Sequence, residues 1–183
     1  MNVSSLRLRK RVAKEAASLL YFGIEKEYKQ AKLKAAKISR SKFLPTNLEV
    51  AIELNNIAEE NEGYSRRERL IRMRKEALKL MQLLRAYKPL LIGSVWRGTI
   101  QRNSDIDITV YHDKPEDILD ILKQPQIKIE QTEWVTVTKK GSKKNSFHIY
   151  AELTTKEKIE IKVAPSLEAF QKERCEIYED EIT

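Results

Sequence analysis

The spacing of apolar residues changes at Pro89 from that of helices to that of strands. Before Pro89, apolar residues recur every three or four positions, first over residues 5–39 with an expected break at Gly23, and then on both sides of Gly63. After Pro89, apolar and polar residues alternate, as in residues 105–111 (Asp-Ile-Asp-Ile-Thr-Val-Tyr). The sequence therefore predicts an α+β protein, in which a small mixed β-sheet flanked by helices follows an N-terminal helical region.

Two short patterns mark helix starts in the first half. Thr46 with Glu49 and Ser65 with Glu68 have the spacing of capping boxes, in which a hydroxyl and a carboxylate accept from the first free N–H groups of a helix. We therefore expect one helix to begin at Thr46 and another at Ser65.

The second half is predicted to supply the sheet. Strands are expected at residues 90–92, 105–111, 127–138, 146–153 and 159–163, a short helix at 115–123, and a final helix capped by Ser166. We expect residues 1–88 to form a basic helical region that packs on a core of residues 89–183, because no low-complexity linker separates them.

Positive charge is concentrated near the N-terminus. The formal net charge is +8, and residues 1–44 hold twelve Lys or Arg against three Glu. A basic segment favours RNA, DNA or another polyanion as a partner, because Lys and Arg make most contacts to phosphates. A solvated helix face is the alternative, since the segment carries no recognisable RNA-binding motif.

Several classes of protein are disfavoured by the composition. No apolar run approaches the roughly 20 residues that span a bilayer, and the N-terminus lacks a secretory signal, so we expect a soluble cytoplasmic protein with no membrane partner. Cys175 is the only cysteine, which excludes an internal disulfide and a zinc site built on paired cysteines. His112 and His148 have no partner at metal-ligand spacing, so neither is expected to bind a metal.

A Gly-Ser turn after the first predicted strand suits a phosphate group. Glycine lets an anion approach the backbone closely, and N–H groups at a helix start donate to phosphate oxygens. We therefore expect Gly93 and Ser94 to bind a triphosphate, with Ser104 also contacting the nucleotide. Arg97 and Arg102 are candidates for neutralising phosphate charge, and pairing with a nearby acid is the alternative for each.

Two aspartates are expected on one face of the strand at residues 105–111. Asp105 and Asp107 alternate with isoleucines, and adjacent carboxylates repel each other unless a cation lies between them, which predicts a Mg²⁺ site. Two metal ions need a third carboxylate on a neighbouring strand. Glu160, in Ile-Glu-Ile-Lys-Val, is the first candidate and Glu152 the second.

One segment resembles the motif of the DNA polymerase beta-like nucleotidyltransferases, with the pattern Gly93-Ser94-x-x-Arg97-Gly98-x5-Ser104-Asp105-x-Asp107. It is most similar to the small prokaryotic members, the minimal nucleotidyltransferases related to kanamycin nucleotidyltransferase. The close resemblance covers residues 91–110 and extends more loosely to Val163. The chain departs from the family at Trp96, where a small residue is frequent, and at Glu160, where Asp is common.

The resemblance implies transfer of NMP from an NTP, with ATP the expected donor, to an acceptor hydroxyl on RNA, protein or a small molecule. It also implies Mg²⁺ or Mn²⁺ held by Asp105, Asp107 and Glu160, the last of which also helps the nucleophile lose its proton. The basic N-terminal helices favour an RNA or protein acceptor. The alternative is a catalytically silent or antitoxin-like module that binds nucleotide or RNA and acts through a partner protein.

Overall fold

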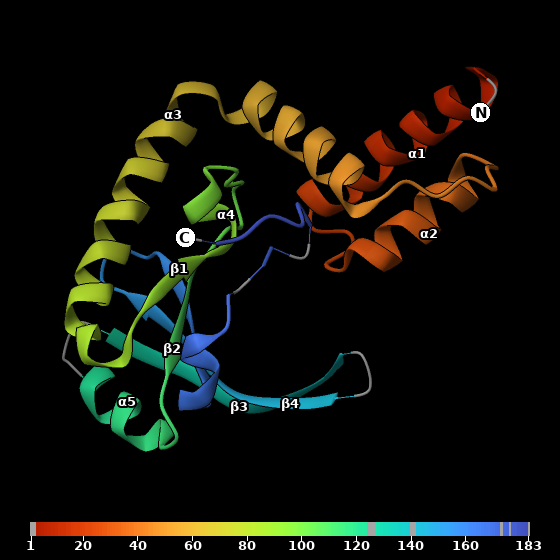
Figure 1. Ribbon diagram of the computed structural model, residues 1–183. Helices are drawn as coiled ribbons and strands as arrows, with labels where there is room; N and C mark the ends of the chain where they lie inside the picture. Colours follow the sequence, from red (N-terminus) through yellow and green to blue (C-terminus); the bar gives the residue numbers. More distant parts are fainter. Residues whose placement is uncertain (1–2, 124–126, 140–141, 173, 176, 183) are drawn as a thin grey trace. The chain divides into compact units, whose positions relative to one another are not determined.

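A computed structural model describes residues 3–123, 127–139, 142–172, 174–175 and 177–182 (Figure 1). The chain forms two compact units: the first comprises Met1–Arg67, Ile100–Arg102 and Glu176–Glu179, and the second comprises Glu68–Thr99, Asn103–Cys175 and Asp180–Thr183. The units divide within helix α3, and the expected domain boundary after residue 88 stays a prediction. In the part of the chain that is described, no helix combines the length and hydropathy needed to cross a bilayer.

Helices α1 (Val3–Tyr21) and α2 (Tyr28–Ile38) pack against each other in the first unit. The turn between them contains Gly23 at φ 70°, a left-handed conformation that glycine adopts without strain, so the predicted break is confirmed. The core of this unit is built mainly from small side chains, which let the helices approach closely. It includes Val12, Ala13, Ala16, Ala17, Leu19, Leu20, Ala31, Ala35, Val50, Ile57 and Ala58.

The predicted capping box at the start of α3 (Asn47–Leu83) is confirmed. The Glu49 N–H donates to Thr46 Oγ1 at 3.1 Å, and the Thr46 N–H donates to Glu49 Oε2 at 2.6 Å. The Glu49 carboxylate also accepts from Arg9 of α1 at 2.7 Å, so the cap ties the two helices together.

The predicted capping box at Ser65 is wrong. Helix α3 is interrupted at Gly63, with φ 50° and ψ −127°, and becomes helical again directly afterwards. Ser65 therefore lies inside the helix, and its hydroxyl donates to the Glu62 carbonyl at 2.7 Å. The expected division of this segment into two helices is correct, because a glycine with this backbone conformation kinks the helix.

A five-stranded mixed sheet in the order β1-β2-β5-β4-β3 forms the second unit's centre. Strand β2 (Ile106–Tyr111) is antiparallel to β1 (Leu90–Ile92) and parallel to β5 (Lys158–Ala164). Strand β4 (Ser142–Leu153) is antiparallel to both β5 and β3 (Ile127–Lys139). The predicted α+β class, with helices preceding a mixed sheet, is confirmed.

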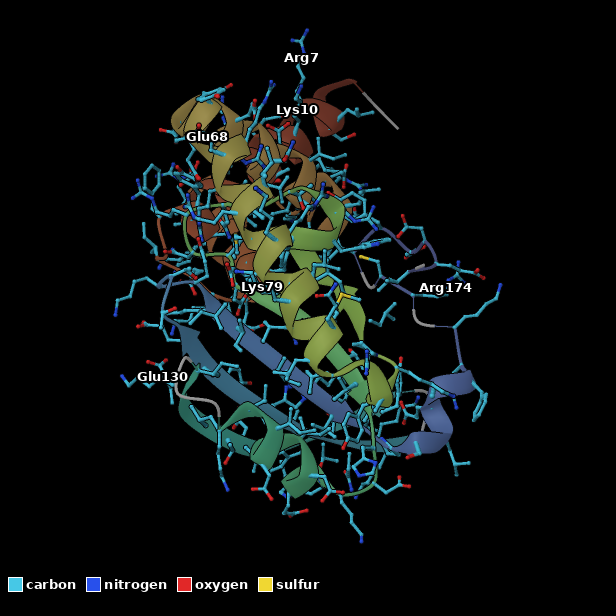
Figure 2. All side chains as sticks on the ribbon, turned by 90° about the vertical axis from the view of Figure 1, so that its left-hand side faces the viewer. Arg7, Lys10, Glu68, Lys79, Glu130 and Arg174 are labelled. Carbon is cyan, nitrogen blue, oxygen red and sulfur yellow. The ribbon has the colours of Figure 1, made fainter. Side chains whose placement is uncertain are left out.

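One face of this sheet is covered by helices. The second half of α3, which carries Glu68 and Lys79, lies in front of the sheet together with α5 (Pro115–Leu122) in Figure 2, and both lie on the same side of the strands in Figure 1. The apolar residues of β2 and β5 are buried beneath them. These are Ile106, Ile108, Val110, Ile159, Ile161 and Val163, and the helices contribute Met73, Ala77, Leu80, Ile118 and Leu122.

Three short helical segments complete the second unit. They are α4 (Gly93–Arg97) and the 3-10 turns η1 (Arg85–Tyr87) and η2 (Ser166–Phe170). The final helix predicted to start at Ser166 is therefore only a 3-10 turn, and its Ser166 N–H donates to Asp113 at 2.9 Å. The predicted helix over residues 115–123 is confirmed as α5.

Candidate active site

Parallel pairing of β2 with β5 brings three predicted carboxylates together. Asp107 is directly paired with Glu160 across these strands, and Asp105 immediately precedes β2. Because Ile106 and Ile108 are fully buried on the helix-covered face, the carboxylates occupy the opposite face. Ligand oxygens of Asp105, Asp107 and Glu160 all lie within 4.8 Å of one another.

The close packing of these carboxylates changes their acidity. Burial raises the pKa of Asp107 to about 8, and the negative charges of Asp105 and Glu160 add to the effect. Burial also raises the pKa of Asp105, with a further contribution from Glu160, while the positive charge of Lys158 acts in the opposite direction. A divalent cation would remove the repulsion, and three carboxylates are the hard oxygen ligands that Mg²⁺ and Mn²⁺ prefer. The residues present therefore fit such an ion.

The Gly-Ser turn borders the carboxylates. Ile92, the last residue of β1, pairs with Asp107, and Gly93 follows at φ 70°. A Cβ at Gly93 would overlap Asp107 Oδ2 and lie 2.9 Å from its Cγ. Ser94 Oγ donates to Ser104 Oγ at 3.0 Å, which joins the turn to the segment that leads into Asp105.

Comparison with known proteins assigns this unit to a family. The family model for the nucleotidyltransferase domain matches residues 70–178, more than half of the chain. The chain belongs to the nucleotidyltransferase domain family. Among solved structures, it is similar to one described as the structural basis for the activity of a cytoplasmic RNA terminal U-transferase, with 16% identity, a TM-score of 0.31, and coverage of 64% of this chain. The chain spans 34% of that protein's chain, and no curated protein matches it.

Two other predicted residues of this nucleotidyltransferase domain have different partners. Glu152 accepts from Lys156 Nζ at 3.0 Å and lies outside the group formed by Asp105, Asp107 and Glu160. Arg97 donates to Asp180 Oδ1 at 2.5 Å, and the hydrogen bond to Asp180 raises the pKa of the arginine. The alternative of pairing with a nearby acid therefore describes Arg97 in this structure, and its contact with phosphate stays a prediction.

Arg102 belongs to the first compact unit. Its backbone N–H donates to Glu62 Oε1 at 3.0 Å, and its guanidinium lies 5.6 Å from the centre of the Tyr21 ring. The predicted role of Arg102 in phosphate binding stays a prediction.

The neighbours that Glu160 has on β4 were not predicted from the sequence. Tyr150 is paired with Glu160 across β4 and β5, and His148 Nδ1 lies 2.5 Å from Glu160 Oε1. Burial, followed by the charge of Glu160, raises the pKa of Tyr150, whose hydroxyl donates to Glu133 at 3.0 Å. The alternation of Ser146, His148 and Tyr150 along β4 was visible in the sequence, but only the pairing of β4 with β5 places these side chains on the face of Glu160.

Proposed function

We propose that this nucleotidyltransferase domain transfers NMP from an NTP, with ATP the expected donor, to an acceptor hydroxyl in a metal-dependent reaction. One observation carries the proposal: Asp105, Asp107 and Glu160 come together within 4.8 Å, although Glu160 lies more than fifty residues further along the chain. The Gly-Ser turn lies directly beside them. This combination supports the placement of a triphosphate next to a cation site.

Each residue has a distinct role in the proposed reaction. Gly93 and Ser94 would bind the triphosphate through backbone N–H groups and the Ser94 hydroxyl. Ser94 Oγ donates to Ser104 Oγ at 3.0 Å in this structure, and its proton would turn to a phosphate oxygen while the Ser104 hydroxyl donates in its place. Asp105 and Asp107 would hold the divalent ions, with Glu160 as a further ligand. When bound, Mg²⁺ or Mn²⁺ lowers the pKa of the attacking hydroxyl and neutralises charge on the departing pyrophosphate.

The bond changes follow from these positions. The acceptor oxygen forms a bond to the α-phosphorus, and the bond from that phosphorus to the pyrophosphate oxygen breaks. Glu160 receives the proton of the acceptor hydroxyl. Its carboxylate is suited to this step because one oxygen is hydrogen-bonded to His148 and the second is not required for that contact.

Calorimetric titration of Mg·ATP, Mg·CTP, Mg·GTP and Mg·UTP into the full chain tests the nucleotide site. Binding in the wild type and its loss in Asp105→Asn/Asp107→Asn would support the proposal. Incubation with each α-labelled NTP and total RNA, followed by separation of RNA from protein, then identifies the acceptor class. Absence of binding of all four nucleotides to a folded wild type would contradict the proposal.

The first unit supports an RNA or protein acceptor. Arg7 and Lys10 project from α1 into solvent (Figure 2), and Lys14, Lys29 and Lys37 are also exposed. Exposed cations of this kind attract phosphates at low ionic strength. We propose that they bind the acceptor, and label appearing on RNA in a salt-sensitive manner would support this role.

The second candidate is a catalytically silent or antitoxin-like module that binds nucleotide or RNA and acts through a partner protein. The hydrogen bond from Arg97 to Asp180 favours this alternative, because it engages a side chain that was predicted to bind phosphate. The labelling experiment separates the candidates, because the silent module binds nucleotide without transferring label.

A further inference from the structure

Three side chains on β4 and β5 form a continuous hydrogen-bonded chain that ends at Glu160. Ser146 Oγ lies 2.8 Å from His148 Nε2, and His148 Nδ1 lies 2.5 Å from Glu160 Oε1. The side chains of His148 and Glu160 are only 14% and 25% exposed, and Ser146 is 7% exposed. Ser146 and His148 were not among the residues that carry the family resemblance.

The hydrogen bonds have one set of directions when Glu160 is a carboxylate and His148 is a neutral imidazole. An ionised carboxylate only accepts, so His148 Nδ1–H donates to Glu160. In the neutral imidazole the other nitrogen then carries a lone pair, which accepts from the Ser146 hydroxyl. Glu160 therefore selects the tautomer of His148 that carries a proton on Nδ1, and the Ser146 hydroxyl provides a second hydrogen bond that holds the ring in place.

Glu160 needs such support more than an aspartate would. Its side chain has one more rotatable bond than that of Asp107, with which it is paired across β2 and β5. His148 contacts Oε1 of Glu160, and Tyr150 also hydrogen-bonds to this carboxylate, so the contacts from β4 restrict the side-chain torsions of Glu160. The hydrogen bond thus compensates for the greater freedom of the longer acid.

We infer that His148, held by Ser146, is the positioning residue that orients the Glu160 carboxylate toward Asp105 and Asp107 for cation binding. This inference rests on the proposed function. His148 acts through Glu160 and contacts neither the cation nor the nucleotide. Hydrogen bonds from a neighbouring shell commonly orient metal ligands in this way, and their loss typically lowers metal affinity by about 10- to 100-fold.

Electron paramagnetic resonance of free Mn²⁺, titrated with the full chain in the absence of nucleotide, tests the inference without relying on catalysis. His148→Ala should weaken Mn²⁺ binding by about 10- to 100-fold. His148→Asn places an amide N–H donor near the position of Nδ1 and should recover most of that loss. Ser146→Ala removes one neutral hydrogen bond and should weaken binding by about fivefold.

His112→Ala is the matched control, because His112 is the chain's other histidine and its ring bonds to Asp117 at 2.7 Å. Circular dichroism checks that each variant is folded, and Ser146→Ala carries the test if His148→Ala does not fold, because a loss of binding is expected for it. Unchanged Mn²⁺ affinity in folded His148→Ala, or equal loss in folded His148→Asn and His148→Ala, would overturn the inference while leaving the proposed function intact. A wild type that binds no Mn²⁺ would overturn both.

Discussion

Gly93 approaches Asp107 so closely that any side chain at position 93 would overlap the Asp107 carboxylate. Asp107 lies on β2, and Gly93 directly follows the adjacent strand β1 with φ 70°. The conformation and the contact both require glycine. This relationship explains in physical terms why the predicted phosphate turn begins with that residue.

Gly93→Ala should therefore disrupt the proposed nucleotide site. The new methyl group would displace the Asp107 carboxylate, and a displacement of about 1 Å at a reacting centre is sufficient to lower the rate by about 100-fold. We expect transfer from α-labelled ATP to fall at least that far, and Mg·ATP binding measured by calorimetry to weaken.

Gly63→Ala is the control for backbone strain. Gly63 also has a positive φ, 50°, but a Cβ there would meet no atom within 4 Å. This variant should lose stability by about 1 kcal/mol and retain nucleotide binding. Equal loss of binding in the two alanine variants would contradict the proposed role of the Gly93–Asp107 contact.

Ser94→Ala should raise the KM for ATP more than it lowers kcat. The Ser94 hydroxyl bonds to Ser104 Oγ at 3.0 Å and is proposed to contact the triphosphate, which is bound in both the ground state and the transition state. Loss of one such bond corresponds to about 1 kcal/mol, or roughly a fivefold change in affinity. Steady-state kinetics over a range of ATP concentrations measures the two constants, and a change confined to kcat would contradict the assignment.

The sequence predicted those parts of the fold in which apolar residues follow a regular period. Strands β2 and β5 alternate apolar and polar residues, and their bounds were predicted within one residue. Strand β4 begins at Ser142, four residues before its predicted start. The prediction missed this part of the strand because Lys143, Lys144 and Asn145 are all polar and give no alternating pattern.

The candidate site was predictable where it is continuous in sequence. Gly93 and Asp107 lie within a single motif, whose spacing predicted a turn followed by a strand. The contact of His148 with Glu160 depends on the order and register of β4 and β5, which local periodicity does not specify. Pairing information between distant strands would have been needed to find it.

Arg66→Met should destabilise the first unit. Arg66 is 6% exposed, and it donates to the Ile100 carbonyl at 2.6 Å, to Glu59 at 2.6 Å and to Asn55 at 2.5 Å. Methionine fills a similar volume without these donors, so the free energy of unfolding should fall by about 1–3 kcal/mol, the usual effect of leaving a buried carbonyl without a donor.

Arg67→Met provides the comparison for this change. The Arg67 side chain is 74% exposed and reaches Glu59 at 3.4 Å, so its loss should change stability by less than about 1 kcal/mol. Urea unfolding followed by circular dichroism measures both variants. Similar midpoints for Arg66→Met and the wild type would show that the buried arginine does not stabilise this unit.

The cation-free protein should become less stable as pH rises toward 8, because of Asp107. The pKa of this carboxyl is 3.8 ordinarily and about 8 in the folded chain, owing first to burial and then to the charges of Asp105 and Glu160. Between these values the folded state binds more protons than the unfolded state, so the free energy of unfolding decreases as pH increases. Deprotonation then leaves three repelling carboxylates within 4.8 Å of one another.

Thermal unfolding in EDTA at pH 5.5 and pH 8.5 checks this expectation in the wild type and in Asp107→Asn. The difference between the two proteins isolates Asp107 from other titrating groups, and the variant should gain relative stability at pH 8.5 by at least about 1.4 kcal/mol, the equivalent of one pKa unit. Added Mn²⁺ should raise the wild-type Tm most at pH 8.5, where the carboxylates are ionised.

Glu152→Gln serves as the control, because the hydrogen bond from Lys156 lowers the pKa of Glu152 and any contribution to stability is lost as pH falls instead. Parallel pH profiles for the wild type and Asp107→Asn would contradict the burial of a repelling carboxylate at this position.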